Sequence, residues 1–575
     1  MRVVPLTPVV ALLFWMLPVA EAAAASPAPL FDAPPTVRAT SSGVSSRAAV
    51  RQRPVTSRLG VLVRPDGSHA LGAGDRLELN LFADARFSMT VSEVARHAGH
   101  GLTWGGTLDG VDLGSAALAV YDGALVGQVW TPAATYRIGH APDGTPVVEE
   151  IEQAALPREG DAVAPPVTDA AALETDADTA GDTAAQIDVM VLYTAAARVA
   201  AGGTAAMRAQ AALAVATSNQ AYGNNDLVQR LRLVYSGEVA LTETPDFGAD
   251  LNRLRADPAV GWLRDMTRAD LVSMLVDHGP GALLCGIAFL LRSNSTAFAP
   301  NGFSVVERDC ASSNLSFPHE LGHNMGAHHD VFVIGTDRGL APYSHGWVDL
   351  TGKFRTIMAY NDQCVASIPP FNCQRIPYFS TPGKTFNGRV VGDAVTADNS
   401  RTLSESANTV SNFRPSLASP LTLTAAVNQP TFAVGNTLVA SVSVNHSGGL
   451  AGAADFYAGL MLPNGSAVFF TDVTITPTSG YALGTITNFT TYRPIATGIL
   501  LGAPFSASLP TFFAYPRGGG DPTGGFAFFV LAVTSGALAD GVLASGELLA
   551  ASLAPFTFPA GSPGDAACAG ADCAP

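Results

Sequence analysis

The segment HELGHNMGAHHD, which begins at His319, constrains both the local fold and the chemistry of this chain. His319 and His323 are four residues apart, so on a helix both imidazoles project from one face, with Glu320 beside them. Gly326 can adopt the positive φ that ends a helix, and the resulting turn brings His329 round as a third imidazole. Three neutral nitrogen ligands suit Zn²⁺ and leave one coordination position open to water.

An open zinc position predicts hydrolytic chemistry. Bound zinc lowers the pKa of its water to about 7 and polarises a carbonyl oxygen. Glu320 is placed to take the proton from that water, so we expect it to be the general base. The alternative is a helix with histidines on an ordinary polar face. It would require five specified positions to match by chance, at a probability on the order of 10⁻⁵. Peptide hydrolysis is therefore the expected reaction.

The segment resembles the zinc signature HExxHxxGxxH of the metzincin metalloproteases. A metzincin also has a methionine turn further along the chain, and TIMAY at residues 356–360 matches it. The resemblance implies that Met358 lies beneath the zinc site as an apolar floor and does not bind the ion. The Met-x-Tyr spacing is similar to that of astacins and serralysins, where the tyrosine can approach the zinc. We therefore predict that the Tyr360 hydroxyl stabilises the oxyanion of the tetrahedral intermediate.

Further segments narrow the resemblance. Asp330, directly after the third histidine, resembles the reprolysin branch of the metzincins. Over about residues 186–416 the chain is most similar to the bacterial reprolysin-like peptidyl-Asp metalloendopeptidases, on the segments IDVMVLYT, FSVVERDC, SHGW, FRTIMAY and ADNSRTLSESANTVSNFR. That resemblance implies cleavage on the amino side of Asp, or of Glu, and a cation in the pocket for this residue. The candidates near the right segments are Arg292, Arg355 and Arg375.

Two other histidines lie near the zinc segment. His328 adjoins the third ligand position, but His329 fits the spacing after the glycine turn, so we expect His328 to be a surface or supporting residue. His345, in SHGW, is interpreted as structural, with a role in the substrate pocket as the alternative.

The order of the predicted elements is typical of an α+β metzincin catalytic domain with a mixed twisted sheet and an active-site helix. Hydrophobic periodicity predicts strands at 187–193, 229–239, 270–276, 286–291 and 303–307, and helices at 204–222, from about 312 through the zinc ligands, and at 404–413. We expect 286–291 to be the antiparallel edge strand, which can bind substrate by strand addition because its backbone groups are unpaired.

Composition divides the remaining chain. The predicted organisation is a signal peptide at 1–24, a propeptide at 25–185, the catalytic domain at 186–416, a β-sandwich at 417–560 and a disordered tail at 561–575. Within the propeptide we expect a β-rich part at 56–156, with hairpin turns at four Asp-Gly pairs, and a disordered acidic linker at 157–185. An unrelated β module is the alternative interpretation of the first part.

A propeptide implies a latent precursor, and the group that blocks its zinc is open. The propeptide has no cysteine, so it cannot block the metal with a thiolate. Asp161, in REGD, loosely resembles the aspartate switch of astacins. Four histidines are the alternatives, and each is more typical of an ordinary surface residue: His69, His97, His100 and His140.

Cysteines and charge indicate where the protein acts. All six cysteines follow residue 280, and an exported protein favours disulfides, so we predict the pairs Cys285–Cys310, Cys364–Cys373 and Cys568–Cys573. The net charge of −16 argues against nucleic acid or anionic lipid as a partner. The apolar runs are too short or too interrupted to span a membrane. We therefore expect a secreted protein that acts on proteins or peptides.

Two alternatives remain from the residues alone. One is a secreted binding protein in which the β-sandwich adheres to a surface or substrate and the zinc site is inert. Glu320 disfavours it, since a binding protein needs no base beside the metal. The other is a thermolysin-like enzyme with a downstream glutamate ligand, which is disfavoured because His329 already fills that place. Zn²⁺ is the one expected cofactor, and no sequence feature supports a structural Ca²⁺.

Overall fold

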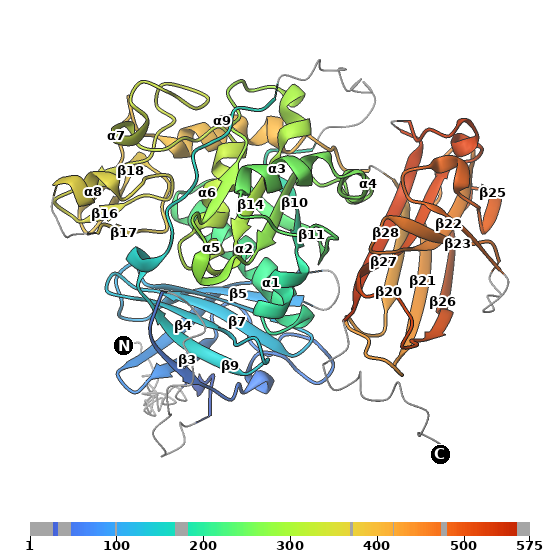
Figure 1. Ribbon diagram of the computed structural model, residues 1–575, viewed down its shortest axis with the longest axis horizontal. Coiled ribbons are helices and arrows are strands. Elements are labelled where there is room, and N and C mark those ends of the chain that lie inside the picture. Colours follow the sequence, from blue (N-terminus) through green and yellow to red (C-terminus); the bar gives the residue numbers. More distant parts are fainter. Residues whose placement is uncertain are drawn as a thin grey trace, which may run out of the picture.

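The computed structural model describes residues 27–32, 48–97, 101–166, 182–367, 372–417, 419–472, 480–544 and 546–559 (Figure 1). The predicted signal peptide at 1–24, most of the predicted linker and the tail with Cys568 and Cys573 lie outside these residues. In the described part of the chain, no helix is long and apolar enough to cross a membrane.

A curved sheet forms the N-terminal part of the protein, and within the described residues its nine strands follow the order β1-β3-β4-β5-β6-β7-β8-β9-β2. Asp122 and Gly123 both have positive φ between β6 and β7, as the turn predicted there requires. The strands are β1 (Ala28–Pro29), β2 (Ala49–Pro54), β3 (Arg76–Phe82), β4 (Ala85–His97), β5 (Gly101–Leu108), β6 (Ser115–Tyr121), β7 (Ala124–Trp130), β8 (Thr135–His140) and β9 (Pro146–Ile151).

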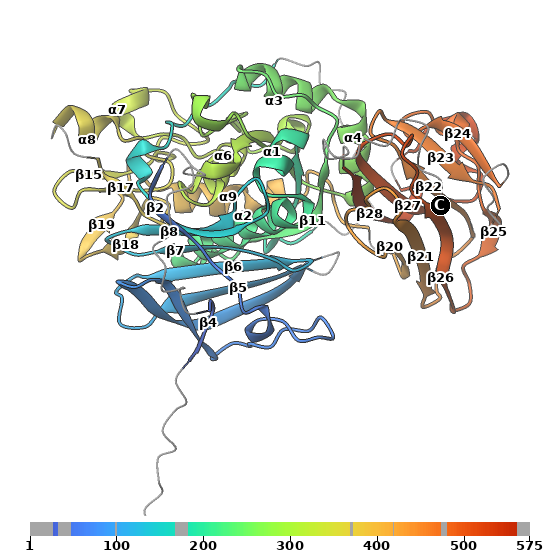
Figure 2. The same cartoon turned by 60° about the horizontal axis from the view of Figure 1, so that its bottom comes forward.

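The N-terminal sheet packs directly on the central part of the protein (Figure 2). One of its faces encloses its own core around Trp104 and Leu118. The other face, with Ala117 and Val126, joins the core formed around helix α2 (Thr204–Asn224). The Gln220 side-chain amide of α2 also donates a hydrogen bond of 2.7 Å to the Ala116 carbonyl on β6. The two parts therefore share a continuous apolar interface.

The central part is built on a five-stranded sheet in the order β11-β10-β12-β14-β13. All its neighbours are parallel except β13, which is antiparallel to β14 at the edge, as predicted. Its α/β arrangement is consistent with the expected α+β catalytic domain. The strands are β10 (Gln186–Tyr193), β11 (Arg230–Glu238), β12 (Leu271–Val276), β13 (Gly286–Ala288) and β14 (Phe303–Glu307).

Three details of this part differ from the predictions. The edge strand ends at Ala288, because the Leu291 amide bonds to the His323 carbonyl of the zinc helix instead. The zinc helix α6 starts at Ser316 and not near 312, because Leu315 has a left-handed φ of 56° that separates it from the short helix α5 (Arg308–Ala311). Two helices between β11 and β12 were not predicted, α3 (Phe247–Ala256) and α4 (Pro258–Thr267).

Small elements complete the central part. Helix α9 (Asn399–Val410) starts five residues before the predicted position, because the Asp398 carboxylate caps it by accepting from the Arg401 amide. The others are α1 (Ala195–Ala200), α7 (Val331–Ile334), α8 (Asp362–Ser367), β15 (Val348–Asp349), β16 (Phe354–Arg355), β17 (Gln374–Arg375), β18 (Thr381–Phe386) and β19 (Arg389–Val391).

The C-terminal part consists of two facing sheets beside the central part (Figure 1). It contacts the central part through Trp262 of α4, whose indole packs edge-on against Phe529 and donates to the Tyr492 hydroxyl at 2.9 Å. The strands are β20 (Leu421–Val427), β21 (Thr437–His446), β22 (Ala453–Met461), β23 (Ser466–Phe470), β24 (Tyr481–Thr485), β25 (Ala496–Leu500), β26 (Phe505–Pro516), β27 (Gly524–Thr534) and β28 (Leu548–Phe558).

Candidate metal centre

Helix α6 (Ser316–Asn324) and the turn after it bring the three predicted ligands together. His319 and His323 lie on one face of the helix, and Gly326 follows it with a φ of +92°. A side chain at Gly326 would also collide with Leu340, since a Cβ there would lie 2.7 Å from the Leu340 Cβ. The glycine therefore permits both the backbone turn and the close packing that returns His329 to the helix.

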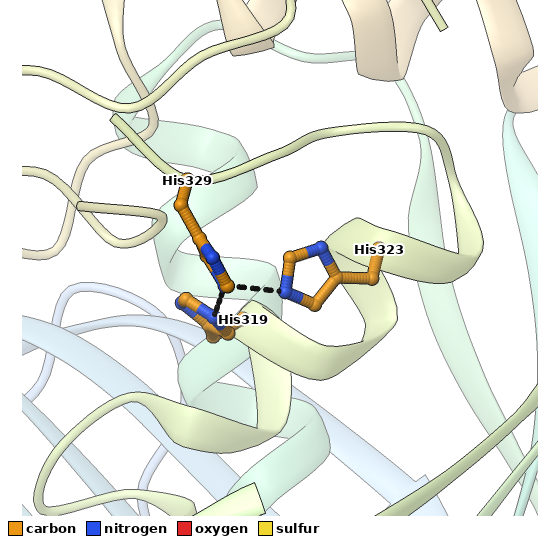
Figure 3. Close-up of side chains that lie close together, drawn as sticks. All are labelled: His319, His323 and His329. Carbon is orange, nitrogen blue, oxygen red and sulfur yellow. Dashed lines mark hydrogen bonds between the residues drawn. The ribbon is translucent and has the colours of Figure 1, made fainter. Parts of the chain in front are cut away.

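The three imidazoles converge on one point through their Nε2 atoms (Figure 3). The His329 Nε2 lies 3.2 Å from that of His319 and 2.9 Å from that of His323, and all three side chains are fully buried. A tetrahedral zinc ion with bonds of about 2.0–2.1 Å would separate such nitrogens by roughly 3.3 Å. The spacing of this donor set therefore fits one zinc ion.

The surroundings also favour the chemical form that binds a metal. The Nδ1 atoms of His319 and His323 each lie 2.8 Å from a backbone carbonyl, of Ile357 and Ala327, so Nδ1 carries the proton and leaves the Nε2 lone pair free. Burial lowers the pKa of His323 to about 3, and burial also lowers those of His319 and His329 well below the usual range. All three rings are thus held neutral.

The predicted methionine turn lies beneath the zinc helix. A Cβ at Gly322 would lie 2.7 Å from the Met358 Sδ, so glycine is required for the helix to rest on this methionine. The turn is tied to the ligand loop, since the Tyr360 amide donates to the Asp330 carboxylate at 2.8 Å. Met358 thus supports the ligands from below, as the resemblance implied.

Glu320 is fully buried beside the ligands, and neither of its carboxylate oxygens has a hydrogen-bond partner among the described residues. Its side chain lies against the edge strand, because a Cβ at Gly286 would come within 2.6 Å of the Glu320 Oε1. Burial raises its pKa well above the usual range, the Glu159 carboxylate raises it further and Arg375 opposes them. The carboxyl therefore lies close to the edge strand, with no partner of its own among the described residues.

The chain after β9 passes through this site (Figure 1). We call residues 158–163 the pro-segment; it lies parallel to the edge strand, with Arg158 beside Leu284 and Val163 beside Phe289. The Gly160 amide donates to the Gly286 carbonyl at 2.8 Å, and a Cβ at Gly160 would lie only 2.7 Å from that carbonyl oxygen. The edge strand therefore already carries an added extended segment.

Glu159 is a buried residue of the pro-segment, and no local sequence pattern pointed to it. Its carboxylate forms an ion pair with Arg375 of β17 and accepts hydrogen bonds from Ser316 and Asn314. Asp161, the residue with the resemblance to an aspartate switch, is exposed. Because Glu159 lies 157 residues before Ser316 in the chain, only the folded arrangement identifies it.

Tyr360 also contacts the pro-segment. Its hydroxyl donates to the carbonyls of Glu159, at 3.0 Å, and Gly160, at 2.7 Å. Its ring centroid lies 4.1 Å from that of His329. Burial raises its pKa well above the usual range, so the phenol keeps its proton and can donate. The tyrosine therefore lies beside the ligands, with a donor that points at backbone carbonyls in the cleft.

Two further predicted histidines lie beside this centre. His345 is buried and its Nδ1 lies 3.1 Å from the His329 carbonyl, whereas His328 approaches Asp337 at 3.4 Å, so both support the ligand loop. The disulfides Cys285–Cys310 and Cys364–Cys373 are formed as predicted, and the first joins the start of the edge strand to α5.

A converging histidine triad with a buried glutamate and a methionine beneath it defines a metzincin-type metallopeptidase centre. Residues 183–387 match the family model of the reprolysin-like metallopeptidases, family M12B. A peptidyl-Asp metalloendopeptidase of Xanthomonas campestris is 30% identical over 420 residues, which cover 69% of this chain and 96% of that protein. The chain belongs to this metallopeptidase family.

Other similar proteins match a shorter part. A peptidyl-Asp metalloendopeptidase of Stenotrophomonas maltophilia is 37% identical over 249 residues, 41% of this chain and 55% of that protein. One from Pseudomonas aeruginosa is 31% identical over 252 residues, 40% of each chain. The chain thus spans about half the length of the first relative and two fifths of the second. A solved structure, metalloproteinase-II from Bacteroides fragilis, is 8% identical with a TM-score of 0.31.

Proposed function

We propose that the protein is a zinc endopeptidase that is exported as a latent precursor and cuts proteins on the amino side of acidic residues. The observation that carries this proposal is the convergence of three Nε2 atoms beside the buried Glu320, directly at an edge strand that accepts an extended segment. The relatives named as peptidyl-Asp metalloendopeptidases support the preference for Asp.

Each residue of the site has a role in this reaction. Zinc, when bound by His319, His323 and His329, supplies a Lewis acid and a water of lowered pKa. Glu320 takes the proton of the attacking water and passes it to the leaving amine. Tyr360 donates its hydroxyl to the carbonyl oxygen, which gains negative charge in the tetrahedral intermediate.

The edge strand positions the substrate. Gly286 and Ala288 accept backbone hydrogen bonds from Gly160 and Val163, at 2.8 and 2.9 Å, in the way that a bound peptide would be held. Because the pro-segment occupies these groups and the Tyr360 hydroxyl, a substrate cannot use them at the same time. This occupancy supports latency of the precursor.

The proposal is tested with the purified full-length chain and its processed form. Cleavage products of a mixed peptide library are identified by mass spectrometry, before and after zinc is removed with a chelator and restored. We expect cleavage mainly before Asp or Glu that stops on chelation and returns with zinc. An intact library, or cleavage that the chelator leaves unchanged, contradicts a zinc endopeptidase.

A further inference from the structure

Arg375, in β17, has almost no contact with solvent. Its side chain is 1% exposed, and the carboxylate of Glu159, 0% exposed, is its only ion-pair partner among the described residues. Glu159 belongs to the pro-segment, whereas Arg375 belongs to the central part. A buried guanidinium that loses its carboxylate is strongly destabilised, so release of the pro-segment leaves a site that requires another anion or water.

We propose that Arg375, Asn314 and Ser316 form the pocket that binds the acidic side chain of the substrate, and that Glu159 occupies this pocket in the precursor. The inference rests on the proposed function, because it assigns residues to the preference for acidic side chains. The pro-segment then blocks the enzyme through its specificity pocket as well as along the edge strand.

The pocket is built to hold a carboxylate. The Ser316 hydroxyl donates to the Glu159 Oε1 at 2.7 Å and the Asn314 side-chain amide donates to the same oxygen at 3.0 Å. Arg375 adds a charge-assisted bond, and its guanidinium is itself held by the Asn314 carbonyl at 2.7 Å. Three donors converge on one oxygen, so a neutral amide, which presents fewer lone pairs and no charge, binds less well.

The pocket lies next to the reacting bond. The Tyr360 hydroxyl contacts the carbonyl of Glu159 itself and that of the following residue, Gly160. The same tyrosine packs against the ligand His329. A residue whose side chain enters the pocket therefore has its backbone directly beside the group that we assign to oxyanion stabilisation. This adjacency is what an enzyme requires to select a side chain beside the bond that it cuts.

The other two candidate cations do not fit this role. Arg355 is buried, but its guanidinium donates to the backbone carbonyls of Cys373 and Ala359, and it has no carboxylate ion pair among the described residues. Arg292 is 42% exposed and pairs with Asp337 on the surface. The folded structure thus favours Arg375 as the cation of the pocket, whereas sequence position alone could not distinguish it from the other two arginines.

The first experiment measures specificity as a ratio. Peptides that differ only in Asp, Asn or Glu after the scissile bond are offered to the processed forms of the wild type, Arg375→Gln and the matched control Arg292→Gln. We expect the kcat/KM ratio of Asp to Asn to fall at least ten-fold in Arg375→Gln and to stay unchanged in Arg292→Gln. A ratio that Arg375→Gln leaves unchanged overturns the pocket, while absence of zinc-dependent cleavage by the wild type overturns the proposed function instead.

The second experiment needs no variant of the enzyme, so it decides the question even if Arg375→Gln does not fold. Peptides with the sequence of residues 156–166 are tested as inhibitors of the processed wild type from initial rates, with their integrity checked by mass spectrometry. We expect Glu159→Gln to weaken inhibition at least ten-fold, whereas Asp161→Asn, the matched loss of an exposed charge, changes it less than two-fold. Equal weakening by both substitutions, or by neither, overturns the proposal.

Discussion

At the scale of single residues, Glu320 is the group on which the proposed chemistry depends. Its carboxylate forms no hydrogen bond with a ligand histidine among the described residues, so Glu320→Gln should leave the histidine triad intact. The glutamine amide cannot accept the proton of the attacking water. We expect one zinc per chain and a loss of about 10²–10⁴-fold in kcat. Metal analysis and a casein assay on the same sample check this. Normal hydrolysis at full zinc content would show that Glu320 is not the base.

The third ligand behaves differently. His329 bridges the other two imidazoles through its Nε2, so its replacement by alanine removes the point on which the donor set converges. We expect His329→Ala to lose the metal and activity together, whereas His345→Ala, beside it but outside the triad, keeps the metal. Equal zinc contents of the two variants would contradict the ligand assignment.

Tyr360 contacts backbone carbonyls and lies outside the histidine triad. In the processed enzyme, Tyr360→Phe should lower kcat by about ten-fold or more with little change in KM, because the bond to the oxygen strengthens mainly in the transition state. Steady-state kinetics on one acidic peptide measure kcat and KM separately and so check this prediction. An unchanged kcat would leave the tyrosine with the role of holding the pro-segment and packing on His329.

These residues also show what a sequence can reveal about a site. His319, His323 and His329 were predictable because eleven positions of one helix and one turn contain the whole donor set. Glu159 was not predictable, and Arg375 was only one of three candidate cations, since 216 residues separate the two and neither has a local pattern. Their pairing depends on the extended segment after the N-terminal sheet, whose position beside the edge strand only long-range packing determines.

At the scale of elements, strong periodicity located β10, β12, β14 and α2 to within about two residues. The failures have local causes. Helix α6 starts later than predicted because Leu315 has a left-handed backbone conformation. The short helices α3 and α4 were missed, although Asp246 caps α3 and Asp257 caps α4, which also has Pro258 at its first position. The edge strand was predicted too long because its last residues bond to α6 and to the pro-segment instead of β14.

The disulfide Cys285–Cys310 fixes the start of the edge strand. It closes a separation of 25 residues, so its loss should destabilise the fold by about 3.5 kcal/mol on the loop-entropy estimate, against about 2.6 kcal/mol for Cys364–Cys373, which closes 9. We expect the double Cys→Ser variant of the first pair to lower the apparent Tm further and to reduce cleavage. A larger loss for the second pair would contradict this ranking.

At the scale of the whole molecule, we can predict how the enzyme matures from the N-terminal part, the central part and the acidic linker between them. On the proposed function, the pro-segment occupies the edge strand until the chain is cut after it. The linker supplies acidic residues for this cut, Asp169, Asp176, Asp178 and Glu174, which lie outside the described residues. Asp182 marks the far limit, because its amide and carbonyl bond to the Asn412 side chain at 2.9 and 3.0 Å. A cut upstream of Asp182 leaves these bonds intact.

We therefore predict that the enzyme cuts itself before an acidic residue between Asp161 and Asp182. N-terminal sequencing of the wild type should find such a new terminus, while the Glu320→Gln precursor, purified free of other proteases, should keep its N-terminal part. Addition of processed wild type to that precursor should then produce the same terminus, since the linker is a substrate of the proposed specificity. If the Glu320→Gln precursor is processed alone at the same position and rate, another protease performs the maturation, and the acidic residues serve only to keep the linker soluble.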